Sequence, residues 1–126
     1  LYLLENKKIT ITKLKEKINS KQLADIGKKA HHNFENKYRI YKFFRNKKYI
    51  INPGIKFGCD FAVYEKGPGI DHSPYLIQVY NGNETIPATE ITIKGRLAAS
   101  VKKQFIFAIP KGKDEINFIG LAWWKA

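Results

Sequence analysis

Two side chains that can exchange protons flank a loop near the middle of the chain. Tyr64 closes a run of strand-forming residues, and His72 comes just before the next such run. Gly67, Pro68 and Gly69 lie between them and are typical of a turn. Histidine, with an ordinary pKa of about 6.5, can donate a proton near neutrality, whereas tyrosine, at about 10, needs nearby positive charge to accept one. Tyr64 and His72 are therefore candidates for general base and general acid.

Both residues also have a plain structural interpretation. Tyr64 suits an aromatic side chain that closes a strand, and His72 suits a loop histidine bonded to Asp71 or Ser73. Spacing alone permits acid–base chemistry here and does not require it.

The acidic residues and the cysteine give little support to a metal centre. Asp60, Glu65 and Asp71 do not follow a recognised ligand spacing, and Cys59 is the only cysteine. Zinc sites usually combine several Cys and His ligands. We therefore expect no metal and no other cofactor. A lone cysteine also excludes an internal disulfide, which suits a reducing, cytoplasmic location.

The motifs around these residues resemble the catalytic domain of the tRNA-splicing endonucleases of archaea and eukaryotes, and most of all an archaeal-type catalytic subunit. The likeness runs from about Tyr38 to Lys103. The similar residues are Gly58-x-Asp60-Phe61-x-Val63-Tyr64, Gly67-Pro68, His72-Ser73-x-Tyr75-Leu76 and Arg96-Leu-Ala-x-Ser-Val101-Lys-Lys103.

The resemblance implies cleavage of RNA without a metal. Tyr64 would remove the proton of a ribose 2′-hydroxyl, His72 would protonate the departing 5′-oxygen, and Lys103 would stabilise the charge on the phosphate. The products would carry a 2′,3′-cyclic phosphate and a 5′-hydroxyl. Lys103, rather than Lys102, occupies the family's lysine position. The alternative for either lysine is a solvated residue at a helix end.

A second group of residues is expected to hold the RNA. Arg96 matches a family arginine that clamps a flipped-out base against an aromatic ring, and Trp123 and Trp124 are the candidate rings. Lys102 would add positive charge. The tryptophans suit a core or a subunit interface equally well. The substrate that the resemblance implies is precursor tRNA of the bulge-helix-bulge type.

The positive charge of the chain is concentrated in its first half. The net charge is +12, and residues 1–50 hold 14 basic and 4 acidic side chains, which leaves +10. Such a field attracts polyanions. A solvated lysine-rich surface, or an AT-rich genome, produces the same composition. No apolar run approaches the roughly 20 residues of a membrane helix.

The elements that must position the site form a small mixed α/β fold. Apolar spacing predicts helices over residues 21–46 and 89–102. Strand-forming runs cover residues 49–51, 59–64, 75–80, 104–109 and 116–124. We therefore predict a small mixed β-sheet flanked by helices, as in the restriction-endonuclease-like catalytic domain of the resembling family.

The predicted catalytic nuclease domain spans residues 21–126. Residues 1–20 are expected to be the remnant of a small amino-terminal domain, and because the chain opens without methionine we expect it to be trimmed or processed. The run 116–124 is too apolar for an exposed sheet edge, and pairing of such strands joins subunits in the resembling family. We expect a second, non-catalytic subunit in a heterotetramer, with a homo-oligomer as the alternative.

Two other functions remain open. The chain can be a non-catalytic RNA-binding or structural subunit of the same endonuclease, although such a subunit has no need of Tyr64, His72 and Lys103 together. It can also be a metal-dependent DNA nuclease of the restriction type, although Glu65-Lys66 lacks the spacing of that active site.

Overall fold

The computed structural model describes residues 1–72 and 74–122, and the chain divides into two compact units. The first unit is Leu1–Glu35 and the second is Asn36–Ala126. Each unit is described by itself below. The domain boundary suggested by the sequence, after residue 20, stays a prediction.

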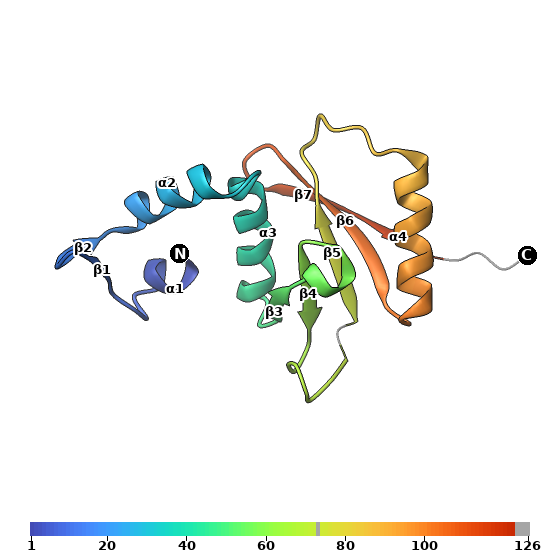
Figure 1. The fold of residues 1–126 in the computed structure, drawn as a ribbon, viewed down its shortest axis with the longest axis horizontal. Helices are drawn as coiled ribbons and strands as arrows, with labels where there is room; N and C mark the ends of the chain where they lie inside the picture. Colours follow the sequence, from blue (N-terminus) through green and yellow to red (C-terminus); the bar gives the residue numbers. More distant parts are fainter. Residues whose placement is uncertain (73, 123–126) are drawn as a thin grey trace, which may run out of the picture. The chain divides into compact units, whose positions relative to one another are not determined.

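The first unit contains two short helices and a β-hairpin (Figure 1). Its elements are α1 (Tyr2–Glu5), β1 (Ile11–Lys13), β2 (Glu16–Ile18) and α2 (Ser20–Ala30). Asn19 caps α2, since its side chain accepts a hydrogen bond from the Gln22 backbone at 2.8 Å while the Gln22 side chain accepts one from Asn19 at 2.9 Å. This reciprocal capping box fixes where α2 begins.

The single helix predicted over residues 21–46 is wrong. The structure has two helices, α2 and α3 (Phe34–Asn46), separated by residues 31–33. His31 is extended and Asn33 has a φ of 56°, and both conformations interrupt a helix. The Phe34 ring packs where a Cβ on Gly27 would stand, 2.5 Å from the ring's Cζ. The apolar residues that predicted one helix thus belong to two helices, and the chain bends between them so that the Phe34 ring packs against Gly27.

The second unit contains a five-stranded sheet in the order β3-β4-β5-β6-β7. The strands are β3 (Ile50–Pro53), β4 (Phe61–Tyr64), β5 (Tyr75–Val79), β6 (Gln104–Lys111) and β7 (Glu115–Leu121). Among the described strand pairs of this sheet only β5–β6 is parallel, and α4 (Ala88–Ser100) makes the crossover between these two strands. A short 3-10 helix, η1 (Ile55–Phe57), precedes β4. The predicted small mixed sheet flanked by helices is confirmed.

The two faces of the sheet are covered by different helices (Figure 1). On one face, Ala98 of α4 packs with Leu76 and Phe105. On the other face, Ile40 and Phe44 of α3 pack with strand residues such as Val63, Ile77 and Ala108. Successive strand residues alternate between these cores, because side chains along a strand point to opposite faces. The position of a residue along its strand therefore tells which face of the sheet its side chain lies on.

Among the strands that the structure describes, β7 forms one edge of the sheet and pairs with β6 alone. Phe118 and Ile119 are 39% and 48% exposed. The Arg39 guanidinium of α3 secures the turn before β7 by donating to the backbone carbonyls of Gly112 at 2.6 Å, Glu115 at 2.9 Å and Lys111 at 3.2 Å.

Within the described residues, no helix combines the length and apolar character needed to cross a membrane.

Candidate active site

Three neighbouring inner strands, β4, β5 and β6, have their ends at the same end of the sheet. Val63, the last residue but one of β4, pairs with Tyr75 at the start of β5, and Tyr75 pairs with Gln104 at the start of β6. The Gln104 N–H also donates to the carbonyl of Pro74 at 3.0 Å. The residue after Val63 is Tyr64, and the residue before Gln104 is Lys103. The antiparallel–parallel order of these strands thus places both candidates at the same end of the sheet.

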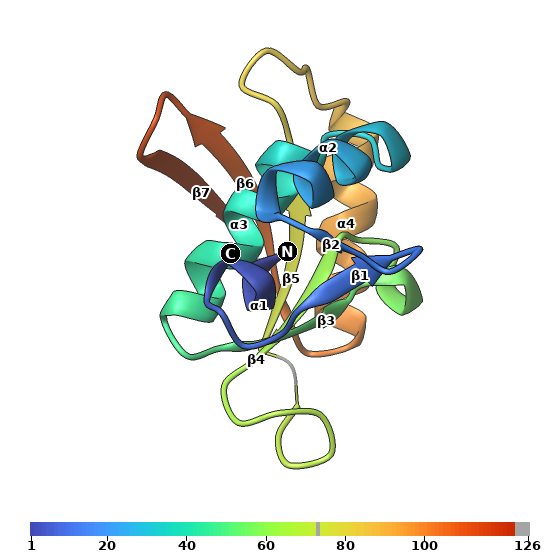
Figure 2. The ribbon, with the colours of Figure 1, turned by 90° about the vertical axis from the view of Figure 1, so that its left-hand side faces the viewer.

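His72 lies at this end of the sheet, in the loop that joins β4 to β5. It is exposed and lies three residues before Tyr75. The loop extends beyond the strand ends in both views (Figure 1, Figure 2). Among the described residues, His72 makes no hydrogen bond. The backbone segments that carry the three predicted catalytic residues therefore lie at the same end of the sheet.

Tyr64 and Lys103 lie on the same face of the sheet. Tyr64 is half-buried and packs against the core on the α4 face, and so does Phe57 of η1. The Lys103 ammonium lies over the Phe57 ring, 5.5 Å from its centroid. Lys103 is half-buried, whereas Lys102 is exposed. The structure thus separates the two lysines and directs Lys103 toward the core that also holds Tyr64.

The end of α4 explains this difference between neighbours. The Lys103 N–H donates to the Ala98 carbonyl at 2.9 Å, and the Lys102 N–H donates to the Ala99 carbonyl at 3.2 Å. Lys102 has a φ of 54°, in the left-handed region. These three features define a Schellman motif, which ends a helix and turns the chain sharply. The motif holds the Lys103 backbone firmly where β6 begins.

The loop before His72 is organised around the Asp71 carboxylate. Its oxygens accept backbone hydrogen bonds from Glu65 at 3.1 Å, Lys66 at 3.0 Å and Gly67 at 2.6 Å. Desolvation alone would raise the pKa of Asp71, but these hydrogen bonds outweigh it and lower the pKa. The carboxylate is thus committed to the backbone of its own loop. The hydrogen bonds of the Asp71 carboxylate go to this backbone and not to His72, and Ser73, the other partner predicted for His72, lies outside the described residues.

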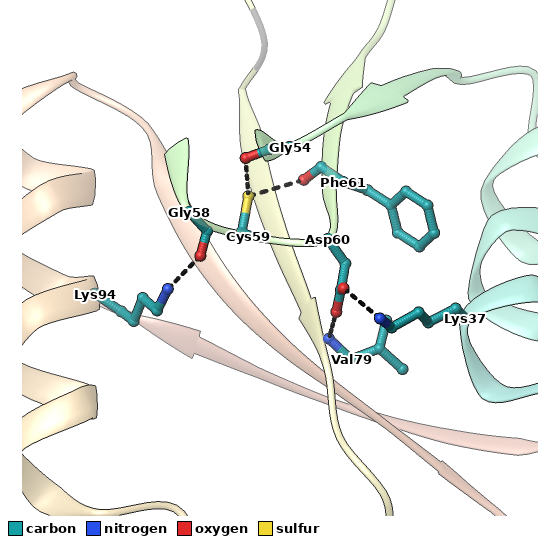
Figure 3. Close-up of polar contacts among 8 residues, drawn as sticks. All are labelled: Lys37, Gly54, Gly58, Cys59, Asp60, Phe61, Val79 and Lys94. Atoms are coloured by element: carbon teal, nitrogen blue, oxygen red, sulfur yellow. Dashed lines mark hydrogen bonds and ion pairs between the residues drawn. The ribbon is translucent and has the colours of Figure 1, made fainter. Parts of the chain in front are cut away.

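Three charged side chains secure the start of β4 (Figure 3). The Asp60 carboxylate accepts the Val79 N–H at 2.8 Å and pairs with the Lys37 ammonium of α3 at 3.0 Å. On the other side, the Lys94 ammonium of α4 donates to the Gly58 carbonyl. Both helices are therefore tied to the segment that leads into β4, at the opposite end of that strand from Tyr64.

Cys59 is buried in the same segment. Its Sγ lies 3.4 Å from the Phe61 carbonyl oxygen and 3.6 Å from that of Gly54 (Figure 3). Burial raises the pKa of the Cys59 thiol to about 11. A protonated, buried thiol is a poor nucleophile, so Cys59 is a packing residue. Within the described part of the chain, no three His, Cys, Asp or Glu side chains gather as ligands for a metal ion.

The predicted RNA-holding residues are only partly placed. Arg96 is exposed on α4, and Lys102 is exposed just beyond the end of that helix. Trp123 and Trp124 lie outside the described residues. Two residues of the site do not follow from the sequence, namely Phe57 beside Lys103 and Asp71 as the organiser of its loop. The adjacency of Asp71 to His72 was a signal for Asp71, whereas nothing in the sequence pairs Phe57 with Lys103.

Comparison with known proteins identifies the family. Residues 34–118 match the family model of the tRNA intron endonuclease catalytic C-terminal domain. This chain belongs to the tRNA intron endonuclease family. The matched segment begins at the first residue of α3 and contains Tyr64, His72 and Lys103. The resemblance found in the sequence is thereby confirmed.

Relatives within the family cover most of the chain. A tRNA-splicing endonuclease of Pyrobaculum arsenaticum is 42% identical over 125 residues, which are 98% of this chain and 68% of the relative. One from Sulfurisphaera tokodaii is 36% identical over 126 residues, 99% of this chain and 70% of the relative. One from Hyperthermus butylicus is 44% identical over 93 residues, 73% of this chain and 51% of the relative. The aligned part of the chain thus spans 51–70% of the length of these relatives.

Proposed function

We propose that this chain is an RNA-cutting subunit that cleaves precursor tRNA at intron–exon junctions without a metal. The observation that carries the proposal is that three strand ends meet at one end of the sheet, next to Tyr64 and Lys103, with His72 in the adjoining loop. Membership of the family supports the same conclusion. The fold supplies a rigid base for the reaction, since two of the three residues directly adjoin paired strand positions.

The proposed reaction is an internal transfer at phosphorus. Tyr64 takes the proton of the ribose 2′-hydroxyl at the cleavage site, and the 2′-oxygen forms a bond to the adjacent phosphorus. The bond from phosphorus to the 5′-oxygen breaks, and that oxygen takes a proton from His72. The Lys103 ammonium stabilises the negative charge that develops on the phosphate oxygens. A 2′,3′-cyclic phosphate and a 5′-hydroxyl result, with no external nucleophile consumed.

Positive charge supports RNA as the partner. Of the net charge of +12, +10 belongs to residues 1–50. Exposed Arg96 and Lys102 add cations near the end of α4, close in sequence to Lys103. We propose that Arg96, with Trp123 or Trp124, holds a base extruded from a bulge-helix-bulge RNA. Stacking of this kind contributes about 1–3 kcal/mol per base.

The edge strand β7 supports assembly with another subunit. Phe118 and Ile119 are exposed there, and one side of the strand is open to pairing within the described sheet. Exposed apolar edges favour strand pairing between chains. We propose that a second, non-catalytic subunit completes a heterotetramer. A homo-oligomer is the alternative.

Substrate discrimination tests the proposal. The purified chain, alone and mixed with candidate partner subunits, is incubated with an intron-containing precursor tRNA, with the same RNA lacking its bulges, and with duplex DNA of equal length. We expect cleavage of the first RNA at both intron boundaries and no cleavage of the other two substrates. Tight RNA binding without cleavage in every mixture would instead assign a structural subunit. Metal-dependent cutting of the DNA would assign a restriction-type nuclease.

A further inference from the structure

The carboxylate of Asp71 is enclosed by successive N–H groups of its own loop. Glu65, Lys66 and Gly67 donate to it at distances of 2.6–3.1 Å. Consecutive N–H groups that converge in this way form an anion-binding nest. Hydrogen bonds to an ionised acceptor are about twice as strong as neutral ones. We refer to this carboxylate with its three donors as the Asp71 clamp.

The Asp71 clamp joins the two ends of the segment between the proposed base and acid. One end is Glu65, the residue after Tyr64, and the other is Asp71, the residue before His72. The bond from the Glu65 N–H to Asp71 therefore links the immediate neighbours of the two proton-transfer residues. The Val63–Tyr75 pair brings the two strand ends together, and the clamp closes the seven loop residues that lie between Tyr64 and His72.

Gly67 lets the loop close around the carboxylate. Its φ of 137° is rarely adopted by residues with a side chain, and an added Cβ would stand 3.1 Å from Cδ1 of Ile50. Its carbonyl accepts the N–H groups of Ile70 and Asp71, both at 3.1 Å. Gly67 thus donates to the Asp71 side chain and accepts from the Asp71 backbone. The turn and the clamp form one unit.

We propose that Asp71 is a positioning residue for the cleavage reaction, because its clamp on the loop backbone fixes His72 relative to Tyr64. This inference rests on the proposed function. The lowered pKa of Asp71 supports it, because the carboxylate then stays ionised through the pH range in which a histidine titrates. The clamp is complete above the folded pKa and is lost as the pH falls through it.

Exposure of the loop makes the clamp necessary. Glu65 and Lys66 are exposed, and Ile70 is 74% exposed, so little packing holds this segment apart from that of buried Gly67. Fixing a free loop costs backbone entropy at every residue that is ordered. The hydrogen bonds to the carboxylate offset part of that cost. Without them the loop samples many conformations, and His72 moves with it.

Three variants separate positioning from charge and from folding. Asp71→Ala removes every acceptor, and Asp71→Asn keeps one side-chain oxygen. Glu65→Gln is the matched control, because it removes one negative charge from the same loop and leaves the Glu65 backbone N–H in place. For each variant we would measure single-turnover cleavage at saturating protein, affinity for an RNA with a 2′-deoxy group at the cleavage site, melting temperature, and amide exchange of residues 65–67.

The proposal predicts a graded loss of rate with intact binding. Asp71→Ala should slow cleavage by roughly 10- to 100-fold, as expected for misplaced catalytic groups. Asp71→Asn should lie between Ala and wild type. RNA affinity should stay within about twofold, since the 2′-deoxy RNA reports binding alone. The amides of Glu65, Lys66 and Gly67 should lose protection in Asp71→Ala and keep it in Glu65→Gln.

Three results would overturn the inference, and one of them also overturns the proposed function. Wild-type cleavage by Asp71→Ala, with its amides deprotected, removes the positioning role alone. A rate loss matched by an equal loss of RNA affinity or by global unfolding also removes it. If the wild-type assembly cuts no intron-containing RNA although its loop amides are protected, the proposed function itself fails. Protection is measured without RNA, so these failures are distinguishable.

Discussion

The ammonium of Lys103 lies 5.5 Å from the centre of the Phe57 ring. A cation over an aromatic face is stabilised by about 1 kcal/mol, and the contact limits the directions that the side chain can take. Lys102, next in sequence, is exposed. The two lysines therefore differ in environment, and only Lys103 is held on the face that also carries Tyr64.

Replacing these lysines tests the assignment of the charge-stabilising residue. Lys103→Ala should reduce single-turnover cleavage by about 100-fold or more, as removal of a group that stabilises transition-state charge does in other enzymes. Lys102→Ala should leave the rate much closer to wild type and is the matched control. The opposite ranking would show that the assignment of the two lysines is reversed.

Tyr64→Phe and His72→Ala should each slow cleavage while RNA binding persists. Loss of a general base or general acid typically costs about 10²- to 10⁴-fold in rate. Tyr64→Phe keeps the ring that packs on the α4 face, so its melting temperature should match wild type. His72 is exposed, so His72→Ala should fold equally well. Near-normal cleavage by either variant would remove that residue from the mechanism.

Lys102→Gly should stabilise the fold. Lys102 occupies the left-handed position of the Schellman motif, with a φ of 54°. A side chain in that conformation costs about 1 kcal/mol, which glycine avoids. We expect the free energy of unfolding in urea to rise by up to about 1 kcal/mol. Lys102→Ala keeps the Cβ and should not show this gain, so equal stability of the two variants would contradict the strain argument.

Ile119→Lys should disrupt assembly through β7. Ile119 is 48% exposed on the edge strand, so the substitution should alter the folded subunit little and oppose burial of the strand in an interface. The mass of the complex would be measured by light scattering. Ile55→Lys is the matched control, because Ile55 is 84% exposed on η1, away from β7 in the chain. Unchanged assembly of Ile119→Lys would exclude β7 as the joining edge.

Much of the sheet follows from the sequence because its core strands are apolar runs. Residues 75–80 and 104–109 were predicted as strands and correspond to β5 and β6. The break between α2 and α3 did not follow, because the stripe of apolar residues continues through it. It depends on the Phe34 ring packing on Gly27, which is a contact in space and leaves no periodic signal.

The candidate site was predictable where residue type carries the chemistry. Tyr64 and His72 are recognisable as proton-transfer groups, and the motif around Lys103 resembles a known family. The Asp71 clamp was not predictable in the same way. Its donors are backbone N–H groups of Glu65, Lys66 and Gly67, which every non-proline residue possesses. Only the conformation of the loop directs them to one carboxylate.

The chemistry of the cut ends is the most direct test of the proposed reaction. An intron-containing precursor tRNA would be incubated with the assembled protein in excess EDTA, and the termini of the products identified by mass spectrometry. We expect undiminished cleavage, with a 2′,3′-cyclic phosphate on one fragment and a 5′-hydroxyl on the other. Loss of cleavage in EDTA, or products with a 5′-phosphate and a 3′-hydroxyl, would contradict the proposed roles of Tyr64, His72 and Lys103.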